Sequence, residues 1–309
     1  MIGVTRVKKI FTNPVMVILF AILCNALWGS AYPAIKIGYA LFNITDNVFD
    51  KLLFAGVRFV LAGLMVLIVS IFVYKKPPTL KKDTVPYVGA MALLYTALQY
   101  VFFYVGLSNT TGTNGSIVNS TQTFLAVILA HFIYKDDKLN VYKVIGSIIG
   151  FMGVLTVTAS GGNAHFSLHG EGFILIAAAC FVLGSVISKK ATQDDLPMSV
   201  TGYNLLFGGI ILVVVGICGG GVLQDAGVGG ALNILYLAFL SAAAFTIWTM
   251  LLTYNHISKI SIYNFIIPVS GTILSAIFLG EDIRDIRYVI SLVLVCMGIV
   301  IVNKFGQKA

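Results

Sequence analysis

Ten apolar runs, each long enough to cross a lipid bilayer, follow one another along the whole chain. An α-helix needs about 20 apolar residues to span a hydrocarbon core roughly 30 Å thick. The runs cover residues 15–37, 52–73, 86–106, 115–134, 141–159, 170–188, 199–220, 232–253, 260–279 and 286–303. Only 10% of the 309 residues are charged, whereas about 25% are charged in a soluble domain. The sequence therefore predicts an all-α integral membrane protein with ten transmembrane helices.

The basic residues are distributed unevenly between the two sides of the predicted membrane. With the N-terminus in the cytoplasm, 15 of the 20 Lys and Arg residues fall in cytoplasmic segments, three fall in outer segments, and Lys36 and Arg58 lie inside runs. Cytoplasmic loops of membrane proteins carry such an excess of positive charge. We therefore expect a multi-pass protein of the cytoplasmic membrane with both termini cytoplasmic. Because topology accounts for the net charge of +8, we expect no nucleic acid partner.

One stretch occurs twice with the same plan. Residues 116–139 and 262–285 each run from polar residues through an apolar span to a charged break, and Met-Gly follows in the next run both times, at Met152 and Met297. The sequence therefore predicts two five-helix repeats, residues 1–159 and 160–309. Five crossings are an odd number, so the second repeat is inverted relative to the first. Many secondary transporters are built from inverted repeats around a site at the membrane midplane.

Polar and aromatic side chains inside the runs are the candidates for that site. Polar groups that face lipid are costly, so they are expected to face the bundle interior or a wet cavity. Packing or interfacial aromatics and close-packed Ser and Thr residues are the alternative explanation for some of them. The candidate solute-binding residues are Trp28, Tyr32, Arg58, Tyr95, Gln99, Asn119, Gln122, Trp248 and Asn264.

Arg58 lies roughly 10 Å inside the second run at 1.5 Å per residue. A buried Arg needs a carboxylate, backbone carbonyls, water or a substrate as its partner. Snorkelling to the outer surface and a role at the cavity both stay open.

Two prolines are candidates for helix bending or gating. Pro33 removes a backbone hydrogen bond within the first run and is expected to kink it. Pro268 predicts a bent helix in the second half, whereas Gln122 favours a straighter and more polar helix in the first.

Several kinds of chemistry are not indicated. No run carries an Asp or Glu near its middle, although proton relays and cation sites in transporters normally use such carboxylates. The four cysteines lie inside apolar runs without the spacing of a metal site, so we expect neither a metal nor a cofactor. The last run of each half, 141–159 and 286–303, is mostly aliphatic and is a candidate for a scaffold or a homodimer contact.

The chain resembles the EamA group of the drug/metabolite transporter superfamily over essentially its whole length. The resemblance rests on Leu27-Trp28-Gly29, Arg58-Phe59, Tyr104 with Gly106-Leu107, and Pro268 followed by Phe278-Leu279-Gly280-Glu281. It implies an export carrier with a central cavity formed by both halves, and amino acids or small metabolites as common cargo. The chain departs from the family pattern at Gln122, where a Pro is usual, and at Lys135, where an acidic residue is usual.

We therefore expect an alternating-access carrier, and not an enzyme, that exports a small amino acid or related solute. Its partners are that solute and the lipid bilayer. The alternative is an integral membrane enzyme acting on a lipid or lipid-linked substrate, for which His131, Asp136 and Asp137 are the candidate groups.

Overall fold

The computed structural model describes residues 2–133, 139–158, 167–255, 260 and 262–305, and within these every regular element is a helix. The elements are α1 Ile2–Thr12, α2 Pro14–Leu41, α3 Val48–Tyr74, α4 Val85–Met91, η1 Ala92–Leu98, α5 Gln99–Ser108, α6 Gly112–Asn119, α7 Thr121–Ile133, α8 Val141–Thr158, η2 Leu168–Gly172, α9 Phe173–Ala191, α10 Pro197–Cys218, α11 Gly227–Tyr254, η3 Ile262–Phe265, α13 Ile266–Leu279, α14 Ile286–Val300 and η4 Ile301–Phe305.

Six helical segments are long and apolar enough to cross a membrane, judged by length and composition. They are Pro14–Leu41, Val48–Tyr74, Val85–Ser108, Leu168–Ala191, Pro197–Cys218 and Gly227–Tyr254, and three shorter apolar helices accompany them at Val141–Thr156, Ile266–Leu279 and Ile286–Val300. Each of these nine segments overlaps one of the predicted runs, so the predicted all-helical membrane architecture is confirmed.

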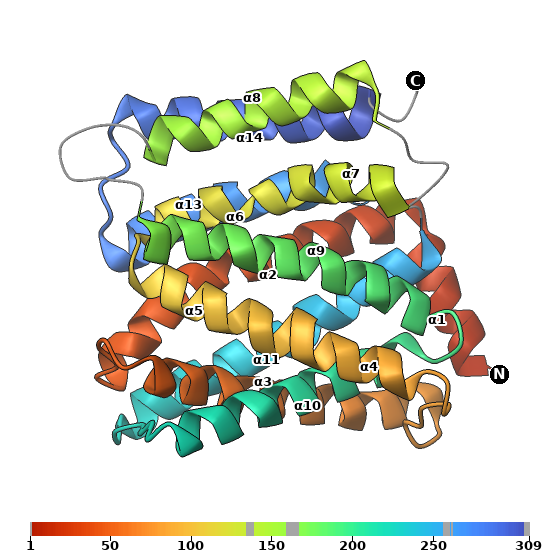
Figure 1. The fold of residues 1–309 in the computed structure, drawn as a ribbon. Helices are drawn as coiled ribbons and strands as arrows, with labels where there is room; N and C mark the ends of the chain where they lie inside the picture. The colour runs from red at the N-terminus through yellow and green to blue at the C-terminus, as the bar shows by residue number, and fades with distance from the viewer. Residues whose placement is uncertain (1, 134–138, 159–166, 256–259, 261, 306–309) are drawn as a thin grey trace.

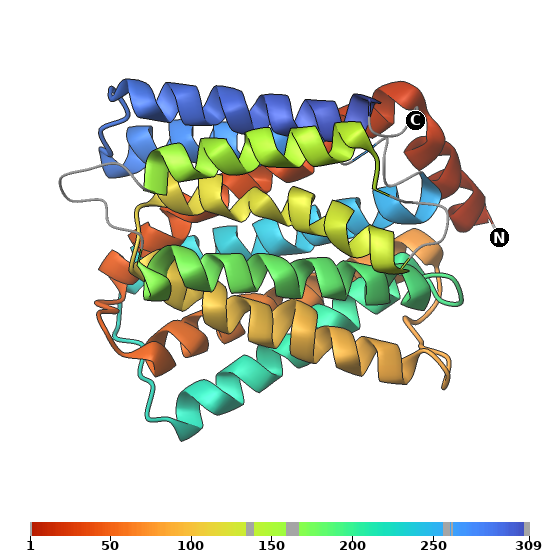
Figure 2. The same cartoon turned by 45° about the horizontal axis from the view of Figure 1, so that its top comes forward.

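The long helices lie side by side in layers, and short connections join them at the two ends of the bundle (Figures 1 and 2). α8 and α14 pack together as the outermost layer on one side, and α3 and α10 pack together on the opposite side. The first and last described elements, α1 and η4, lie at the same end of the bundle in both views, and we call it the terminal end. The other end carries the α5–α6 and α13–α14 connections.

Local sequence signals explain where α2 begins. The Asn13 side chain accepts hydrogen bonds from the backbone N–H groups of Val15 (3.0 Å) and Met16 (3.2 Å), and Pro14 occupies the first turn. Such a cap satisfies donors that have no partner within the helix. α2 then continues past Pro33 to Leu41, four residues beyond the predicted run.

Glycines bring α3 and α10 into backbone contact. A Cβ atom added at Gly56 would lie 2.6 Å from the Val213 backbone nitrogen, and one added at Gly63 would lie 2.5 Å from that of Leu206. Small residues permit such close approach between membrane helices, where dispersion contacts replace the hydrophobic effect as the driving force.

The expectation that Gln122 gives the first half a straighter helix is not supported, because its span is interrupted at Ser120 between α6 and α7. The Ser120 hydroxyl donates to the Ile117 carbonyl (2.5 Å), and the Thr121 hydroxyl donates to the Val118 carbonyl (2.7 Å). Hydroxyls that bond back to carbonyls compete with the helical hydrogen bonds. These bonds accompany the interruption, which lies directly before Gln122.

A second local feature has no counterpart in the sequence-based expectations. The third span is wider over η1, Ala92–Leu98, where its backbone is π-helical. A Cβ atom at Gly208 of α10 would lie 2.4 Å from the Thr96 Cβ and 3.0 Å from the Ala92 carbonyl oxygen, so the wide turn fits against a glycine. π-helical turns are frequent at functional sites, and this one carries Tyr95.

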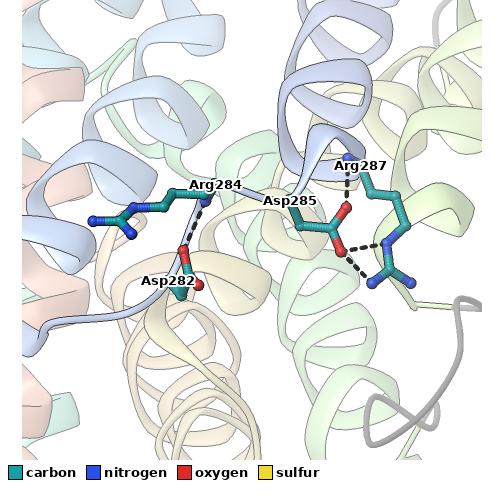
Figure 3. Close-up of polar contacts among 4 residues, drawn as sticks. All are labelled: Asp282, Arg284, Asp285 and Arg287. Carbon is teal, nitrogen blue, oxygen red and sulfur yellow. Dashed lines mark hydrogen bonds and ion pairs between the residues drawn. The ribbon is translucent and has the colours of Figure 1, made fainter.

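The α13–α14 connection is fixed by short-range polar contacts (Figure 3). Asp282 accepts a hydrogen bond from the Arg284 backbone N–H at 2.9 Å. Asp285 accepts from the backbone N–H of Arg287 at 2.9 Å and pairs with its guanidinium. Gly280, which precedes these residues, has a φ of +66°, and this left-handed conformation at the end of a helix favours glycine.

Candidate functional site

Five aromatic rings meet in the middle of the bundle and form what we call the central aromatic cluster. Its ring centroids lie 5.0–5.9 Å apart between contacting pairs. The members are Trp28 of α2, Tyr95 of η1, Phe181 of α9, and Phe245 and Trp248 of α11. Three candidates from the sequence, Trp28, Tyr95 and Trp248, are therefore brought together. Edge-to-face contacts of this kind favour a fixed ring geometry.

Several buried polar atoms on the spans that carry the cluster residues have no partner among the described residues. They include the Asn25 Oδ1, Gln99 Oε1 and Trp248 Nε1 atoms, all of which are buried. Asn25 uses its amide nitrogen to donate to the Ala21 carbonyl at 2.7 Å. A buried polar group that makes no hydrogen bond is costly and needs an explanation. A polar solute or water held next to the aromatic rings would provide partners for these atoms.

Arg58 lies in the interior, with 1% of its surface exposed, so snorkelling to the surface is excluded. Its Nε donates to the Ser241 hydroxyl at 2.8 Å, and one Nη donates to the Tyr104 hydroxyl at 2.7 Å. The guanidinium also lies 4.6 Å from the ring centre of Phe59 and 5.6 Å from that of Tyr100. Among the described residues, no carboxylate forms an ion pair with it.

The Arg58 environment connects to the central aromatic cluster through two rings. The Phe59 and Tyr100 rings lie 6.4 Å and 6.5 Å from Phe245, which belongs to the cluster. Gln99 lies beside Tyr100. Arg58 therefore places a positive charge one ring away from the cluster.

The remaining candidates lie on α2, α6, α7 and η3, and two separate contacts are seen among them and their neighbours. The Tyr32 hydroxyl lies beside the Asn119 side chain. The Asn264 amide donates to the Thr123 hydroxyl at 3.4 Å, and its Oδ1 has no partner among the described residues. Gln122 is buried on α7, next to Thr123.

The two prolines occupy different places in their helices. Pro33 is buried within α2. Pro268 lies in the first turn of α13, just after the 3-10 segment η3. A first-turn proline lacks only an N–H that would have no helical partner, so Pro268 is compatible with the change from η3 to α13.

A groove of about 580 Å³ opens between α2, α11 and α13, away from the central aromatic cluster. Pro33, Leu232, Leu274 and Phe278 are among its mostly apolar lining residues. Its polar contacts include a 2.6 Å hydrogen bond between the Ser30 and Tyr236 hydroxyls, and the Asn233 amide donates to the Ala34 carbonyl at 2.9 Å. The groove contains none of the nine candidate solute-binding residues.

Residues suited to other chemistry do not gather in the described part of the chain. No group of three or more His, Cys, Asp or Glu residues lies close enough there to hold a metal ion. The His131 Nδ1 accepts a hydrogen bond from the Leu139 backbone N–H at 3.2 Å. Asp136 and Asp137, proposed with it for an enzyme, lie outside the described residues.

Sequence reasoning missed four residues of this region. Phe181 and Phe245 complete the aromatic cluster, and Ser241 and Tyr104 bind the Arg58 guanidinium. Tyr104 carried a signal, because it belongs to the motifs behind the family resemblance. The two Phe residues carried none, since the chain has 21 Phe and apolar runs are rich in them.

Comparison with known proteins places this arrangement in a family. The EamA-like transporter family model matches residues 15–159 and 168–304. The chain is 30% identical over 276 residues to the uncharacterized transporter YyaM of Bacillus subtilis, covering 84% of this chain and 88% of the relative. It is 25% identical over 305 residues to a "Probable amino-acid metabolite efflux pump" of Salmonella typhimurium, covering 93% and 94%.

Two further similarities agree with this result. A chloroplastic WAT1-related protein of Arabidopsis thaliana is 27% identical over 274 residues, and the match covers 85% of this chain and 63% of that relative. A crystal structure superposes with a TM-score of 0.67 at 13% identity, covering 96% of this chain and 99% of the other, and at that identity the likeness shows the fold alone. Because the family model matches most of its length, the chain belongs to the EamA-like transporter family and is a multi-pass membrane protein.

Proposed function

We propose that this transporter exports a small amino acid or a related solute across the cytoplasmic membrane by alternating access. The proposal includes ten spans in two inverted five-helix halves, residues 1–159 and 160–309, with both termini cytoplasmic. The observation that carries it is the central aromatic cluster, which draws Trp28 and Tyr95 from the first half and Phe245 and Trp248 from the second. A site shared by two halves can be exposed to either side when the halves move relative to one another.

The arrangement of the bundle ends supports the proposed topology. α1 and η4 lie at the terminal end, together with the connection between α3 and α4 that carries four lysines. At that end, the Lys81 backbone N–H donates to Asp195 at 2.8 Å, which joins the α3–α4 and α9–α10 connections. A concentration of Lys at this end agrees with a cytoplasmic position.

The proposed solute-binding residues are those expected from the sequence. The unpaired Gln99 and Trp248 atoms would bind polar groups of the solute, and Asn119, Gln122, Tyr32 and Asn264 would contact it from α2 and the fourth helices of the two halves. Arg58 would attract its carboxylate, since a buried cation is stabilised by an opposite charge. The amino-acid cargo named for the Salmonella relative supports the same class of solute.

Counterflow tests this function. Purified protein in liposomes preloaded with an unlabelled amino acid should take up the radiolabelled one, and Trp28→Ala and Asn119→Ala should abolish uptake. Trp28→Phe keeps an aromatic ring at this position and is the control for misfolding as the cause of lost uptake in Trp28→Ala. Phe72→Ala is the matched control, because Phe72 is 66% exposed on the outside of α3 and should leave uptake unchanged. The proposal fails if a broad panel of amino acids and metabolites gives no counterflow with folded protein.

A second arm of the experiment tests Arg58. We expect Arg58→Gln to reduce counterflow of an amino acid at least tenfold, in line with about 1.5–3 kcal/mol for a hydrogen bond to a charged group. Competition by the corresponding amino-acid amide, which lacks the carboxylate, should change little. If recognition of the amino acid and of its amide fell equally in Arg58→Gln, Arg58 would be needed for folding and would not bind the carboxylate of the solute.

A further inference from the structure

Two carboxylates from the second half bind the α5–α6 connection and the start of α6 in the first half. The Glu281 Oε1 accepts a hydrogen bond from the Gly112 backbone N–H at 2.7 Å, and its Oε2 accepts from the Thr113 backbone N–H at 2.8 Å. Glu171 accepts from the Thr110 hydroxyl and, at 2.9 Å, from the Ser167 backbone N–H. One connection of the first half is thus bound by carboxylates that lie 61 and 168–169 residues away in the sequence.

The Glu281 contact is strong for a physical reason. Gly112 and Thr113 are the first residues of α6, whose N–H groups have no partner within the helix and form its positive end. A carboxylate that accepts two of them makes two charge-assisted hydrogen bonds in parallel. Lys36 of α2 lies in electrostatic range of the same carboxylate. Glu281 therefore links α6 to the α13–α14 connection.

This contact does more than cap a helix. α6 already has its own cap, since the Thr111 hydroxyl accepts a hydrogen bond from the Asn114 backbone N–H at 3.0 Å. Glu281 is partly exposed, so water can replace it on the Gly112 and Thr113 N–H groups. α6 can consequently stay helical when Glu281 is released. The hydrogen bonds that Glu281 accepts hold α6 against the α13–α14 connection, and α6 does not need them to form a helix.

Behind the Glu281 contact, α6 and α13 are packed too closely for a solute to pass. A Cβ atom added at Gly112 would lie 2.5 Å from the Ser275 Oγ and 3.3 Å from its Cβ. One added at Gly271 would lie 2.5 Å from the Ser116 Cβ. Ser116 and Ser275 are fully buried. The bundle is closed along this seam at the end opposite the terminal end (Figures 1 and 2).

We propose that Glu281 is the latch of a gate at that end of the transporter. Its carboxylate holds α6 against α13 and closes this side, and release of the Gly112 and Thr113 N–H groups accompanies opening. This inference rests on the proposed transport function, in which each end of the bundle opens in turn. Glu281 acts as a positioning residue, because it orients the helices that form the passage.

A reversible cross-link tests the closed state. The four native cysteines, Cys24, Cys180, Cys218 and Cys296, are first replaced by Ala. Gly112→Cys and Ser275→Cys are then combined, because their Cβ atoms fall near the roughly 3.8 Å that a disulfide requires. We expect oxidation to join the two cysteines in a disulfide and to stop counterflow. Reduction of the disulfide should restore counterflow. The single-cysteine variants treated with the same oxidant are the controls and should keep transporting. Counterflow that continues through the cross-linked protein would overturn the gate.

Labelling tests the latch itself without any solute. In the same background, Ser116→Cys lies behind the latch, and Ser188→Cys reports on the terminal end, where α9 finishes. In detergent-solubilised protein, where both ends are accessible, we expect Glu281→Gln to speed labelling of Ser116→Cys by a water-soluble maleimide about tenfold, because a neutral amide replaces a charge-assisted bond. Labelling of Ser188→Cys should not change.

The outcomes separate the gate from the proposed function. Unchanged labelling of Ser116→Cys, or equal acceleration at Ser188→Cys, would overturn the latch, since the second result means that the whole bundle has loosened. Either of these labelling results would overturn the latch even if counterflow is normal. The proposed function, by contrast, fails only when folded protein with an intact Glu281 carries no solute.

Discussion

The outermost layer and the centre of the bundle are built in opposite ways. In the layer, α8 and α14 touch through glycines, and the Ser291 hydroxyl donates to the Gly153 carbonyl at 2.6 Å. In the centre, the aromatic rings of the cluster pack together, and polar atoms of Asn25, Gln99 and Trp248 on the same spans have no partner among the described residues. Close packing of small residues stabilises membrane helices, whereas unpaired buried polar atoms destabilise them. Close packing in the outer layer therefore stabilises the fold. In the centre, the missing hydrogen bonds of buried polar atoms lower the stability, and a bound polar solute can supply them.

The largest expected effect lies in the layer, at Gly298. A Cβ atom there would lie 2.5 Å from the Gly146 carbonyl oxygen and 2.7 Å from the Gly150 backbone nitrogen. Because backbone cannot move aside as a flexible side chain can, we expect Gly298→Ala to lower the free energy of unfolding by about 2 kcal/mol, the range for overpacking. Denaturant unfolding in detergent measures this change.

The matched control for Gly298→Ala is Gly89→Ala. Gly89 lies on α4, and an added Cβ would have no neighbour within 4 Å. In a helix, Ala is more favourable than Gly by roughly 0.5–1 kcal/mol, so this variant should be neutral or slightly stabilised. Counterflow per folded molecule should be unchanged in Gly298→Ala. Equal stability losses at the two sites would remove close packing as the basis of the layer.

A pair of substitutions distinguishes the satisfied Ser291 hydroxyl of the layer from the Gln99 amide oxygen of the centre, which has no partner among the described residues. Ser291→Ala removes a hydrogen bond and should cost about 0.6 kcal/mol without affecting transport. Gln99→Met removes a buried acceptor that has no partner and should stabilise the protein by about 1 kcal/mol while reducing counterflow. Unfolding and counterflow assays on the same preparations measure both effects. A destabilised Gln99→Met would show that Gln99 is already satisfied.

The smallest effect is expected at the exposed end of the layer, where Asp285 caps α14. Hydrogen bonds from Arg287 lower the pKa of Asp285 to about 2. A carboxyl whose pKa is lowered on folding contributes stability above its unfolded pKa of about 3.9 and loses this contribution as the pH falls towards 2. We therefore expect Asp285→Ala to lower the melting temperature slightly at pH 7 and less at pH 3.

Asp285→Asn controls for the cap itself, since Asn caps a helix about as well as Asp. Its melting temperature at pH 7 should lie between those of the wild type and Asp285→Ala. A difference between wild type and Asp285→Ala that grows on acidification would contradict the pKa direction. An effect as large as that of Gly298→Ala would mean that the end of α14, and not its packing, stabilises the layer.

Much of the fold was predictable because its determinants are local. Bilayer thickness sets the length of an apolar run, and the predicted runs overlap the observed helices from α2 to α14. Trp28 and Tyr32, which were expected to face the bundle interior as polar or aromatic residues inside an apolar run, both contact it. The interruption at Ser120 and the π-helical turn at Tyr95 were not predicted, because they depend on hydroxyl bonding and on a glycine of α10.

By itself, the sequence determined the membrane class, the order of the helices and their polar faces, since each depends on residues within a few turns of one another. Only the tertiary structure decided which faces meet. The Arg58 guanidinium donates a hydrogen bond to Ser241, which is 183 positions away in the sequence, and Glu281 accepts one from Gly112, which is 169 positions away. Helical spacing can point a side chain inward, but a partner that distant is chosen by how the helices pack. The aromatic cluster and the Glu281 contact are therefore products of packing.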